Sequence, residues 1–377
     1  MECPRCHNQE SRYLYSIHGE VYCRKCIQFH RVMIDELRNT KQLSFKPSLT
    51  TYHLSFCLSP AQQAISQGLV DCFKRRENAY VWAVCGSGKT EIVFEVMRYA
   101  LSQGCRVCFC VPRKELVKEL YERIQDAFKG IDIGVMYGGV CEKEDAQFIV
   151  CTMHQLYRFE NGYGFDLMVA DEIDAFPFYN NEVLNELFER CCVGSFVKMS
   201  ATIDEKDIHN GELFILNRRY HNHDLPMPKR LIVPSWCHMY MLLILIKKSD
   251  YYIVYVPTIA YVSKVVTFLN KHHICAEGVS SLGEHNDDSI KNLKEHRIQV
   301  LVSTTLLERG ITIENIQVIV MYSNHVVYDW RTLVQIAGRV GRKPQHPDGF
   351  VYILSPEQTI HISKCLSIIK RLNKMSV

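Results

Sequence analysis

From about Tyr80 onward, short apolar runs alternate with longer stretches in which apolar residues recur every three or four positions. Short runs rich in β-branched and aromatic residues predict buried strands, and the longer stretches predict amphipathic helices. The predicted strands are residues 81–84, 106–112, 147–152, 167–172 and 196–202, followed after a break by 251–257, 296–304, 316–322 and 350–355. The clearest predicted helices are residues 91–104 and 113–128. This alternation is typical of an α/β fold with doubly wound parallel sheets.

The break in the pattern lies at residues 216–234, which carry three prolines and a cluster of charges. Because 377 residues are too many for one hydrophobic core, we predict two α/β domains in tandem. The predicted division is residues 1–50 for a small amino-terminal module with its linker, 51–218 for the first domain and 219–377 for the second.

Composition narrows the class of protein. With 47% hydrophobic and 23% charged residues, the chain has the balance of a soluble globular protein. Its longest apolar run, residues 231–246, is shorter than a bilayer span and is interrupted by polar residues, so no transmembrane helix is expected. The amino terminus lacks the pattern of a secretory signal, which predicts a cytoplasmic chain. The 17 cysteines are then not expected to form a disulfide framework.

Charge is distributed unevenly along the chain. The first 50 residues hold eight Lys and Arg against five Asp and Glu, which accounts for the whole net charge of +3. A nucleic-acid surface must therefore come from local patches of basic residues.

A glycine-bearing turn follows the first predicted strand, in the stretch VWAVCGSGKT from Val81 to Thr90. A phosphate-binding loop is usually written G-x-x-x-x-G-K-[ST], and here Ala83 takes the place of the first glycine. A strand that passes through such a turn directly into a helix points backbone N–H groups and the positive helix end at a phosphate. We predict an ATP site in which Lys89 reaches the β- and γ-phosphates and Thr90 holds Mg²⁺. The other predicted ATP contacts of the loop are Gly86, Ser87 and Gly88. The alternative is a plain strand-to-helix turn with an incidental lysine.

Two further features favour a nucleotide site. Asp171 and Glu172 end a predicted strand, at the sheet edge where ligands bind in such folds. Asp171 is predicted to hold Mg²⁺ and Glu172 to polarise the attacking water, although an acidic helix start is the simpler interpretation of this pair taken alone. Upstream, Ser59-Pro60-Ala61-Gln62 predicts a helix capping box, and Gln62 is also a candidate for reading adenine.

The stretch QIAGRVGR, residues 335–342, spaces Arg339 and Arg342 by one helical turn, so both guanidinium groups can point the same way. They are candidates for catalytic arginines that stabilise charge on the γ-phosphate during transfer. A solvated basic face is the alternative, and it explains the glycines of the stretch poorly.

In this order, the stretches resemble the motifs of superfamily-2 helicase-type motors over residues 55–345. The similar stretches are residues 58–62 (adenine-reading motif), 83–90 (motif I, where such motors often carry Ala), 111–116 (Ia), 171–174 (II), 200–202 (III), 303–312 (V) and 335–342 (VI). The resemblance implies two RecA-like domains that use ATP with Mg²⁺. It also implies DNA contacts at Arg113, Gly139, Thr152 and Thr304. Thr305 and Thr312 stand where many relatives have aspartates, and no strand-separating wedge is recognisable, so translocation is better supported than unwinding.

Two cysteine pairs begin the chain: Cys3-x-x-Cys6 and Cys23-x-x-Cys26, separated by 16 residues. This is the spacing of a Cys₄ zinc site, and four thiolates complete the tetrahedral coordination of Zn²⁺, so we predict a structural zinc-binding module. Chance pairing among the cysteines is the alternative to a zinc site. Within the site, His7 and His18 are candidate substitute ligands, although a surface histidine is the simpler interpretation of each. The other cysteines fall mostly in apolar stretches and are predicted to be small buried side chains.

A Cys₄ module joined to this motor, with DEIDAFPFY at residues 171–179, closely resembles the ComFA family of late-competence ATPases of transformable Gram-positive bacteria. The resemblance implies a DNA-dependent ATPase that translocates single-stranded DNA and drives uptake of transforming DNA during natural competence. It implies a position at the cytoplasmic face of the cell membrane, with a competence DNA channel and co-operonic competence proteins as partners, and it is compatible with an oligomer.

Two alternative functions stay open. One is a replication-restart or repair-type DNA helicase, which would unwind duplex DNA. The other is a zinc-bearing adaptor whose ATP cycle switches partner binding, and it would hydrolyse ATP slowly without responding to DNA.

Overall fold

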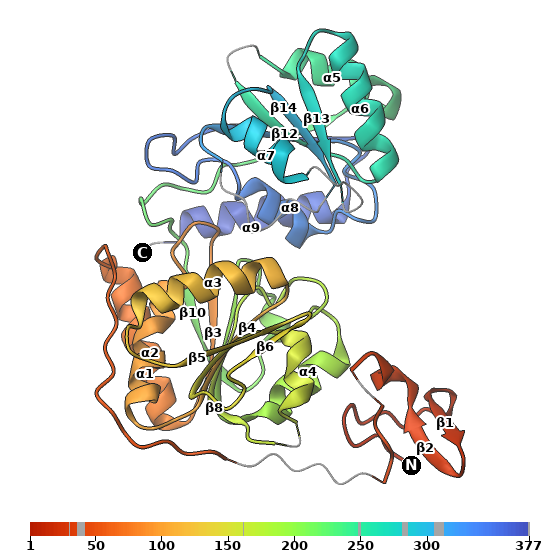
Figure 1. Cartoon of the computed structure of the whole chain (residues 1–377). Helices are drawn as coiled ribbons and strands as arrows, with labels where there is room; N and C mark the ends of the chain where they lie inside the picture. Colours follow the sequence, from red (N-terminus) through yellow and green to blue (C-terminus); the bar gives the residue numbers. More distant parts are fainter. Residues whose placement is uncertain are drawn as a thin grey trace. The chain divides into compact units, whose positions relative to one another are not determined.

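The structure is a computed structural model that describes residues 1–29, 31–35, 42–160, 162–247, 250–280, 286–304 and 313–375. The chain divides into two compact units, shown in Figure 1. The first unit comprises residues 1–82 and 89–215, and the second comprises residues 83–88 and 216–377. The predicted boundaries at residues 50 and 218 stay a prediction, since the division by contacts does not separate the amino-terminal module from the first domain.

The first unit is built on an eight-stranded sheet of order β10-β3-β9-β8-β4-β7-β5-β6. From β3 to β5 neighbouring strands are parallel, and β6 pairs with β5 in the antiparallel sense. The central strand β4 is buried at every position, which is why its sequence VCFCV is an unbroken apolar run. The strands are β3 (Asn78–Ala83), β4 (Val107–Val111), β5 (Ile133–Tyr137), β6 (Val140–Glu142), β7 (Phe148–Thr152), β8 (Phe165–Ala170), β9 (Cys192–Ser200) and β10 (Gly211–Leu216).

Helices cover both faces of this sheet. In Figure 1, α1 and α2 lie on one side of the strands and α4 on the other. Their amphipathic sequences explain this packing: α3, for example, buries Val117, Leu120, Ile124 and Ala127, which share one helical face. The elements are α1 (Pro60–Arg75), α2 (Phe94–Ser102), α3 (Lys114–Ala127) and α4 (Glu182–Cys191), with the short 3₁₀ turns η3 (Glu91–Val93), η4 (Met153–Arg158) and η5 (Glu205–Asp207).

The amino-terminal module contains a two-stranded antiparallel hairpin, β1 (Leu14–Ile17) and β2 (Glu20–Cys23), with η1 (Ser11–Tyr13) before it and η2 (Arg24–Phe29) after it. The chain beyond it follows the first unit closely. The Phe45 amide donates to the Gly104 carbonyl at 2.9 Å, and the His53 amide donates to the Ala127 carbonyl at 3.0 Å. A side chain at Gly104 would lie 2.1 Å from the Phe45 oxygen, so this contact requires the glycine. The predicted linker is therefore bound to the domain that follows it.

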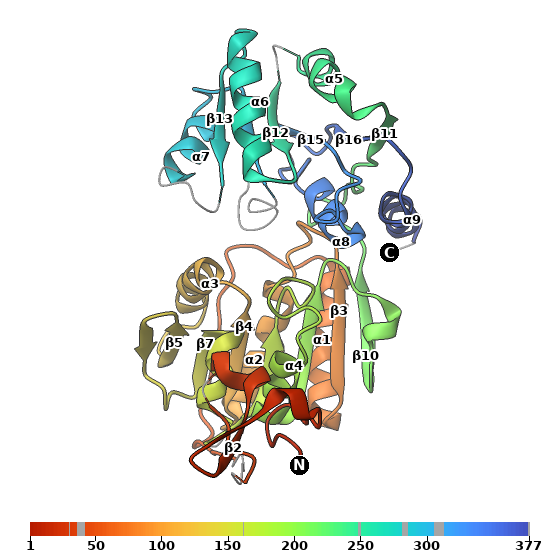
Figure 2. The same cartoon turned by 90° about the vertical axis from the view of Figure 1, so that its right-hand side faces the viewer.

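The second unit has a six-stranded, fully parallel sheet of order β11-β16-β15-β12-β14-β13 (Figure 2). Its core is mainly aliphatic and includes Val254, Val300, Val302 and Ile319. The elements are β11 (Lys229–Ile232), η6 (Ser235–Cys237), α5 (His238–Leu245), β12 (Tyr251–Tyr255), α6 (Ile259–Lys271), β13 (Ala276–Val279), α7 (Asn286–Lys294), β14 (Val300–Ser303), β15 (Ile316–Val320), α8 (Trp330–Ala337), β16 (Val351–Ser355) and α9 (Ile360–Lys374).

The predicted fold class is confirmed: the chain has two α/β parts, each with a parallel sheet. All nine predicted strands are present, each somewhat shorter than or shifted from its predicted range. Among the described residues, no helix is long and apolar enough to span a bilayer.

Candidate nucleotide site and four-cysteine cluster

The carboxyl ends of the parallel strands of the first unit form one edge of its sheet. Asp171 follows β8 directly, and Lys89 follows the loop after β3, with β9 between the two strands. The Lys89 Nζ atom lies 2.9 Å from Asp171 Oδ1. Two predicted ATP residues, 82 positions apart in the sequence, are thus in direct contact at the edge where ligands bind in parallel α/β sheets.

The ion pair is mostly buried, with 19% of the Lys89 side chain and 12% of the Asp171 side chain exposed. Burial raises the pKa of Asp171 above its usual range, while the charge of Lys89 opposes the shift and that of Glu172 adds to it. A lysine paired with an aspartate suits a ligand that carries both negative phosphates and a divalent cation. When such a ligand binds, the lysine can pair with a phosphate and the aspartate with the cation, so neither charge is left without a partner.

The loop between β3 and η3 contains glycines with left-handed backbone, as phosphate-binding loops often do. Gly86 and Gly88 have φ of +80° and +72°, and the Ser87 amide donates to the Val84 carbonyl at 3.1 Å. The predicted direct passage into a helix is wrong. Thr90 has helical dihedrals, but residues 91–93 form a 3₁₀ turn and the α-helix α2 begins only at Phe94. Tighter 3₁₀ bonding is common in the first turn of a helix, which accounts for the late start.

Residues after Asp171 connect a second strand end to the site. Glu172 has a left-handed backbone, with φ of +56°, and its amide donates to Asp171 Oδ1 at 2.8 Å. The Thr202 hydroxyl donates a short hydrogen bond to Asp174 Oδ2. The Thr202 amide donates to Ser200 Oγ at 2.9 Å. The stretches resembling motifs II and III therefore touch through buried polar groups.

The predicted capping box at the start of α1 is confirmed. The Gln62 amide donates to Ser59 Oγ at 3.3 Å, and the Ser59 amide donates to Gln62 Oε1 at 2.7 Å, with Pro60 in the first turn. Gln62 is buried, so its structural role is established here. Its predicted contact with adenine stays a prediction.

Three of the four predicted DNA contacts lie along the same sheet edge as Asp171. Arg113 follows β4, Thr152 ends β7 and Gly139 follows β5, and these three strands are consecutive neighbours in the order β4-β7-β5. Val111 and Thr152 are directly paired in the register. Gly139 is exposed, whereas Thr152 is buried. One edge thus carries the predicted nucleotide residues after β3 and β8 and the predicted DNA residues beyond them.

In the second unit, Thr304 follows β14, while Thr305 and Thr312 lie outside the described residues. The expectation that Arg339 and Arg342 share a helix is wrong. Helix α8 ends at Ala337, because Gly338 occupies its C-cap and Gly341, with φ of +70°, turns the chain away. Arg339 is 3% exposed, which excludes a solvated basic face at this position. The Arg342 Nε atom donates to the Gly338 carbonyl at 3.2 Å.

Sequence reasoning missed the residues that hold this turn. The Arg219 guanidinium donates to the Gly341 carbonyl in a short hydrogen bond and to the Gly338 carbonyl at 3.3 Å. His221 Nε2 lies 3.1 Å from the same Gly341 oxygen. Both residues fall in the charged cluster that the sequence marked only as a boundary, and no motif distinguished them.

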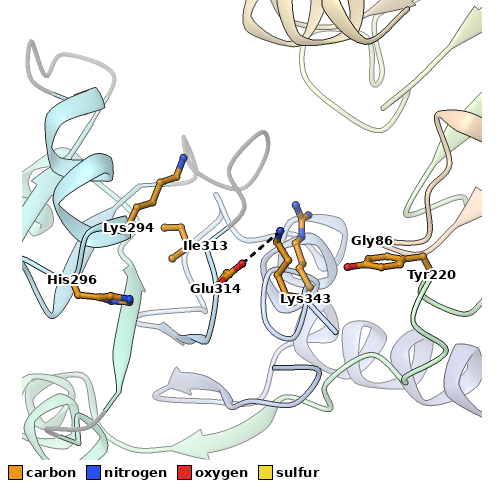
Figure 3. Close-up of a pocket in the computed structure, with 8 residues that line it drawn as sticks. Gly86, Tyr220, Lys294, His296, Ile313, Glu314 and Lys343 are labelled. Atoms are coloured by element: carbon orange, nitrogen blue, oxygen red, sulfur yellow. Dashed lines mark ion pairs between the residues drawn. The ribbon is translucent and has the colours of Figure 1, made fainter. Parts of the chain in front are cut away.

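A cavity of about 570 Å³ in the second unit adjoins Arg342 (Figure 3). Lys343 pairs with Glu314 across 3.6 Å, and Lys294 and His296 lie across the cavity from Tyr220. The lining residues are Gly86, Tyr220, Lys294, His296, Ile313, Glu314, Arg342 and Lys343. Three cationic side chains against one carboxylate make this cavity suitable for an anion.

The four predicted zinc ligands come together in the amino-terminal module. The Sγ atoms of Cys3 and Cys26 are 3.8 Å apart and those of Cys6 and Cys23 are 3.7 Å apart, and all four lie within 4.8 Å of one another. These separations are far longer than a disulfide bond. They match the edge of about 3.8 Å expected for a tetrahedron with metal–sulfur distances of about 2.3 Å. The cluster could therefore hold a metal ion. Of the remaining cysteines, most are buried as predicted.

Two family models match the chain. Residues 55–205 match "Type III restriction enzyme, res subunit", and residues 237–344 match "Helicase conserved C-terminal domain". Together with the two parallel sheets and the Lys89–Asp171 pair, they identify the chain as an ATP-dependent enzyme with a superfamily-2 helicase-like motor. Helicase domains of this kind imply ATP with Mg²⁺.

The curated relatives make the class more specific. The chain is 28% identical to Competence protein ComFA of Bacillus subtilis (strain 168), over 99% of this chain and 86% of that protein. It is 29% identical to Competence protein ComFA of Streptococcus pneumoniae (strain ATCC BAA-255 / R6), over 99% of this chain and 90% of that protein. The resemblance to ComFA is confirmed, and the chain is a competence-related helicase-like motor.

A solved structure, that of S. cerevisiae Dbp5 bound to RNA and ADP BeF3, supports the same fold. The match covers 84% of this chain and 92% of the Dbp5 chain, at a TM-score of 0.56 and 18% identity. At this identity the likeness concerns the fold alone.

Proposed function

We propose that the chain is an ATP-driven translocase of single-stranded DNA that draws transforming DNA into the cytoplasm during natural competence. The observation that carries the proposal is the continuous sheet edge of the first unit. It brings Lys89 and Asp171 within 2.9 Å of each other and continues along neighbouring strand ends to Arg113, Thr152 and Gly139.

In this proposal the nucleotide binds at the strand ends that carry Lys89 and Asp171. Backbone amides of Gly86, Ser87 and Gly88 surround the phosphates, Lys89 neutralises the β- and γ-phosphates, and Thr90 and Asp171 hold Mg²⁺. Glu172 orients the attacking water and accepts its proton, and Gln62 contacts the adenine. The Lys89–Asp171 ion pair supports these roles because it keeps both side chains near the place where a Mg²⁺-triphosphate would separate them.

Arg339 and Arg342 stabilise the charge that develops on the transferring phosphoryl group. This role of the two arginines is supported by the contacts of loop 338–342. Arg219 and His221 contact carbonyl groups of this loop and so fix the backbone from which both arginines extend. Arginines positioned by a rigid backbone can act on a transition state without first reorganising.

Single-stranded DNA binds along Arg113, Gly139, Thr152 and Thr304, mainly through its phosphates. The Cys₄ cluster holds Zn²⁺ as a structural site with no open coordination position. By analogy with the ComFA relatives, the chain works at the cytoplasmic face of the cell membrane, with the competence DNA channel and co-operonic competence proteins as partners, and it can assemble into an oligomer.

An ATPase assay with and without single-stranded DNA tests the proposal. DNA that favours the closed, catalytic arrangement of the enzyme must raise turnover, because two ligands that prefer one conformation assist each other. We expect single-stranded DNA to stimulate hydrolysis several-fold, and more than an equal mass of duplex, with binding that weakens steeply as salt increases.

Two outcomes would favour the alternatives. A turnover rate unchanged by saturating single-stranded DNA at low salt would favour the zinc-bearing adaptor. Efficient separation of duplex strands would favour a repair-type helicase.

A further inference from the structure

A buried ion pair attaches the four-cysteine module to the first domain. Arg5 lies between the ligand-type cysteines Cys3 and Cys6 in the sequence, yet its side chain is only 1% exposed. Its Nε atom lies 3.0 and 2.8 Å from the two carboxylate oxygens of Glu160, which is 2% exposed, and Nη2 makes a further short contact to the same group. A guanidinium group that contacts both oxygens of a carboxylate in this way forms a fork that fixes the distance and the relative orientation of the two side chains.

Arg5 also connects the two halves of the cysteine cluster. Its Nη1 atom donates to the Cys26 carbonyl at 3.3 Å. The turn that carries Arg5 is closed by the His7 amide, which donates to the Cys3 carbonyl at 3.0 Å. The position of the guanidinium therefore depends on both cysteine pairs, 3–6 and 23–26, being held together.

The module contacts the same segment of the first domain a second time. The ring of Phe29, which is 1% exposed, packs against the His154 ring at 5.6 Å between centroids. His154 and Glu160 both belong to residues 152–160, which consist of Thr152, η4 and the two residues that follow it. Thr152 begins this segment at the end of β7, and it is a proposed DNA contact.

Two other ion pairs between the module and the first domain lie at the surface. Lys25 lies 3.5 Å from Glu182, whose side chain is 80% exposed, and His7 lies 3.7 Å from Glu186. Exposed pairs of this type contribute little, whereas separating a buried pair leaves a charge in a dry environment. Among these ion pairs, Arg5–Glu160 is thus the one through which the state of the module can act on the domain.

We propose that Arg5 and Glu160 are positioning residues that couple metal binding by the four cysteines to the DNA-binding edge of the motor. The coupling rests on the proposed metal site and on the proposed DNA contact at Thr152. A metal ion fixes the two cysteine turns, the turns aim Arg5, and Arg5 holds Glu160 and with it residues 152–160. When the metal is lost, Glu160 loses its guanidinium partner and the segment 152–160, which begins at Thr152, loosens.

Amide hydrogen exchange of the full-length chain tests the coupling directly. Removing the metal from the wild-type protein with a chelator should raise exchange in residues 152–160 on the order of tenfold, while the buried strand β4 keeps its protection. Arg5→Gln, which retains all four cysteines, should keep its metal by elemental analysis and show the same rise. Removing the metal from Arg5→Gln should add little, because the two changes break one linkage.

Matched variants separate this coupling from general destabilisation. Lys25→Gln at the exposed pair with Glu182 should behave as wild type, and Glu160→Gln should behave as Arg5→Gln. Arg5→Lys keeps the charge but lacks the fork, so its effect should be intermediate. Unchanged exchange of residues 152–160 in metal-loaded Arg5→Gln, or fully additive effects of the variant and the chelator, would overturn the inference.

Affinity for a fluorescent oligothymidine reports on the DNA edge itself. Arg5→Gln and metal-depleted wild type should each bind it roughly tenfold more weakly than metal-loaded wild type, and their combination no more weakly than either. Wild-type affinity in metal-loaded Arg5→Gln would overturn the coupling to DNA while leaving the proposed function intact. A wild-type chain that does not bind the oligonucleotide would instead defeat the proposed function, and the exchange measurement would still decide whether Arg5 transmits the state of the module.

Discussion

The two parallel sheets hold their candidate catalytic groups in different ways. At the edge of the first sheet, side chains of opposite charge or polarity face each other: Lys89 with Asp171 at 2.9 Å, and Thr202 with Asp174. In the second unit, Arg342 contacts a carbonyl group of its own turn, 3.2 Å away. The first arrangement is a pair of side chains from two strand ends, and the second is a loop that carries its cations on a fixed backbone.

In the proposed function, this difference corresponds to two tasks in ATP hydrolysis. Paired charges at a sheet edge are prepared for a ligand that replaces each partner, which is what ground-state binding of Mg²⁺ and phosphates requires. Arginine side chains on a backbone that is already fixed are positioned before a ligand binds. They suit the stabilisation of negative charge that develops only in the transition state of phosphoryl transfer. Substitutions in the two places should therefore affect binding and turnover in different proportions.

The largest effect is expected at Lys89. Lys89→Ala should abolish hydrolysis and weaken ATP binding, because it removes both the phosphate contact and the partner of Asp171. Glu172→Gln should bind ATP nearly as well as wild type and lose turnover on the order of a thousandfold or more, since it leaves the phosphate loop intact. Steady-state hydrolysis and binding of a fluorescent ATP analogue measure the two quantities.

Appreciable turnover by both variants would contradict the assignment of the first edge as the nucleotide site. The exposed Lys143, which pairs with Asp132, offers a control, and Lys143→Ala should retain wild-type hydrolysis.

The second largest effect is expected at Arg342, and it distinguishes the loop of the second unit from the sheet edge of the first. Arg342→Ala should leave ATP affinity within a few-fold and reduce turnover on the order of a thousandfold, as expected when charge is stabilised only in the transition state. Arg339→Ala should act in the same direction, but Arg339 is buried, so its thermal midpoint must be compared with that of wild type. If affinity and turnover fall equally, the arginines serve ground-state binding and the contrast between the two regions disappears. Arg297→Ala, at an exposed pair with Glu295, should have neither effect.

The sequence predicted the strands and the residues that follow them because both depend on local patterns. Short, fully apolar runs bounded by turn residues, such as β4, are typical of buried strands, and a strand end at a parallel sheet edge places Asp171 at that edge. The strands β11 and β13 were missed because they are short and partly exposed, and the buried strand β5 was missed as well. The helical placement of Arg339 and Arg342 was wrong although the signal was present: Gly338 and Gly341 are typical of a helix end.

Long-range polar contacts could not be predicted from any local pattern. The spacing of the cysteines identified the four-cysteine cluster, yet Arg5 and Glu160 are 155 residues apart and belong to no motif. The same holds for Arg219, which contacts Gly338 and Gly341 more than 100 residues later in the chain. These pairs depend on how the elements pack, and packing decides where a buried charge finds its partner.

The smallest expected effect concerns the buried carboxylate of Asp171 at the sheet edge of the first unit. Burial raises the pKa of Asp171 above its usual range, and the ion pair with Lys89 offsets only part of that shift. A carboxyl group with a raised pKa in the folded chain adds stability below its unfolded-state pKa of about 3.9, and loses that contribution as the pH rises through the folded-state value. At neutral pH the ionised Asp171 therefore costs stability. Asp171→Asn removes the charge but keeps the shape.

Asp171→Asn should thus unfold at a higher temperature than wild type at neutral pH, even though it no longer holds Mg²⁺ for hydrolysis. The difference should shrink as the pH falls through the folded-state pKa of Asp171, and it should vanish only below the unfolded-state pKa of about 3.9, where the carboxyl group is protonated in both states. Thermal midpoints of both proteins across this pH range measure the effect, and Asp132→Asn at its exposed pair should follow wild type throughout. A midpoint of Asp171→Asn at or below that of wild type at neutral pH would mean that attraction to Lys89 outweighs burial, so that the first edge is stabilised by its charges.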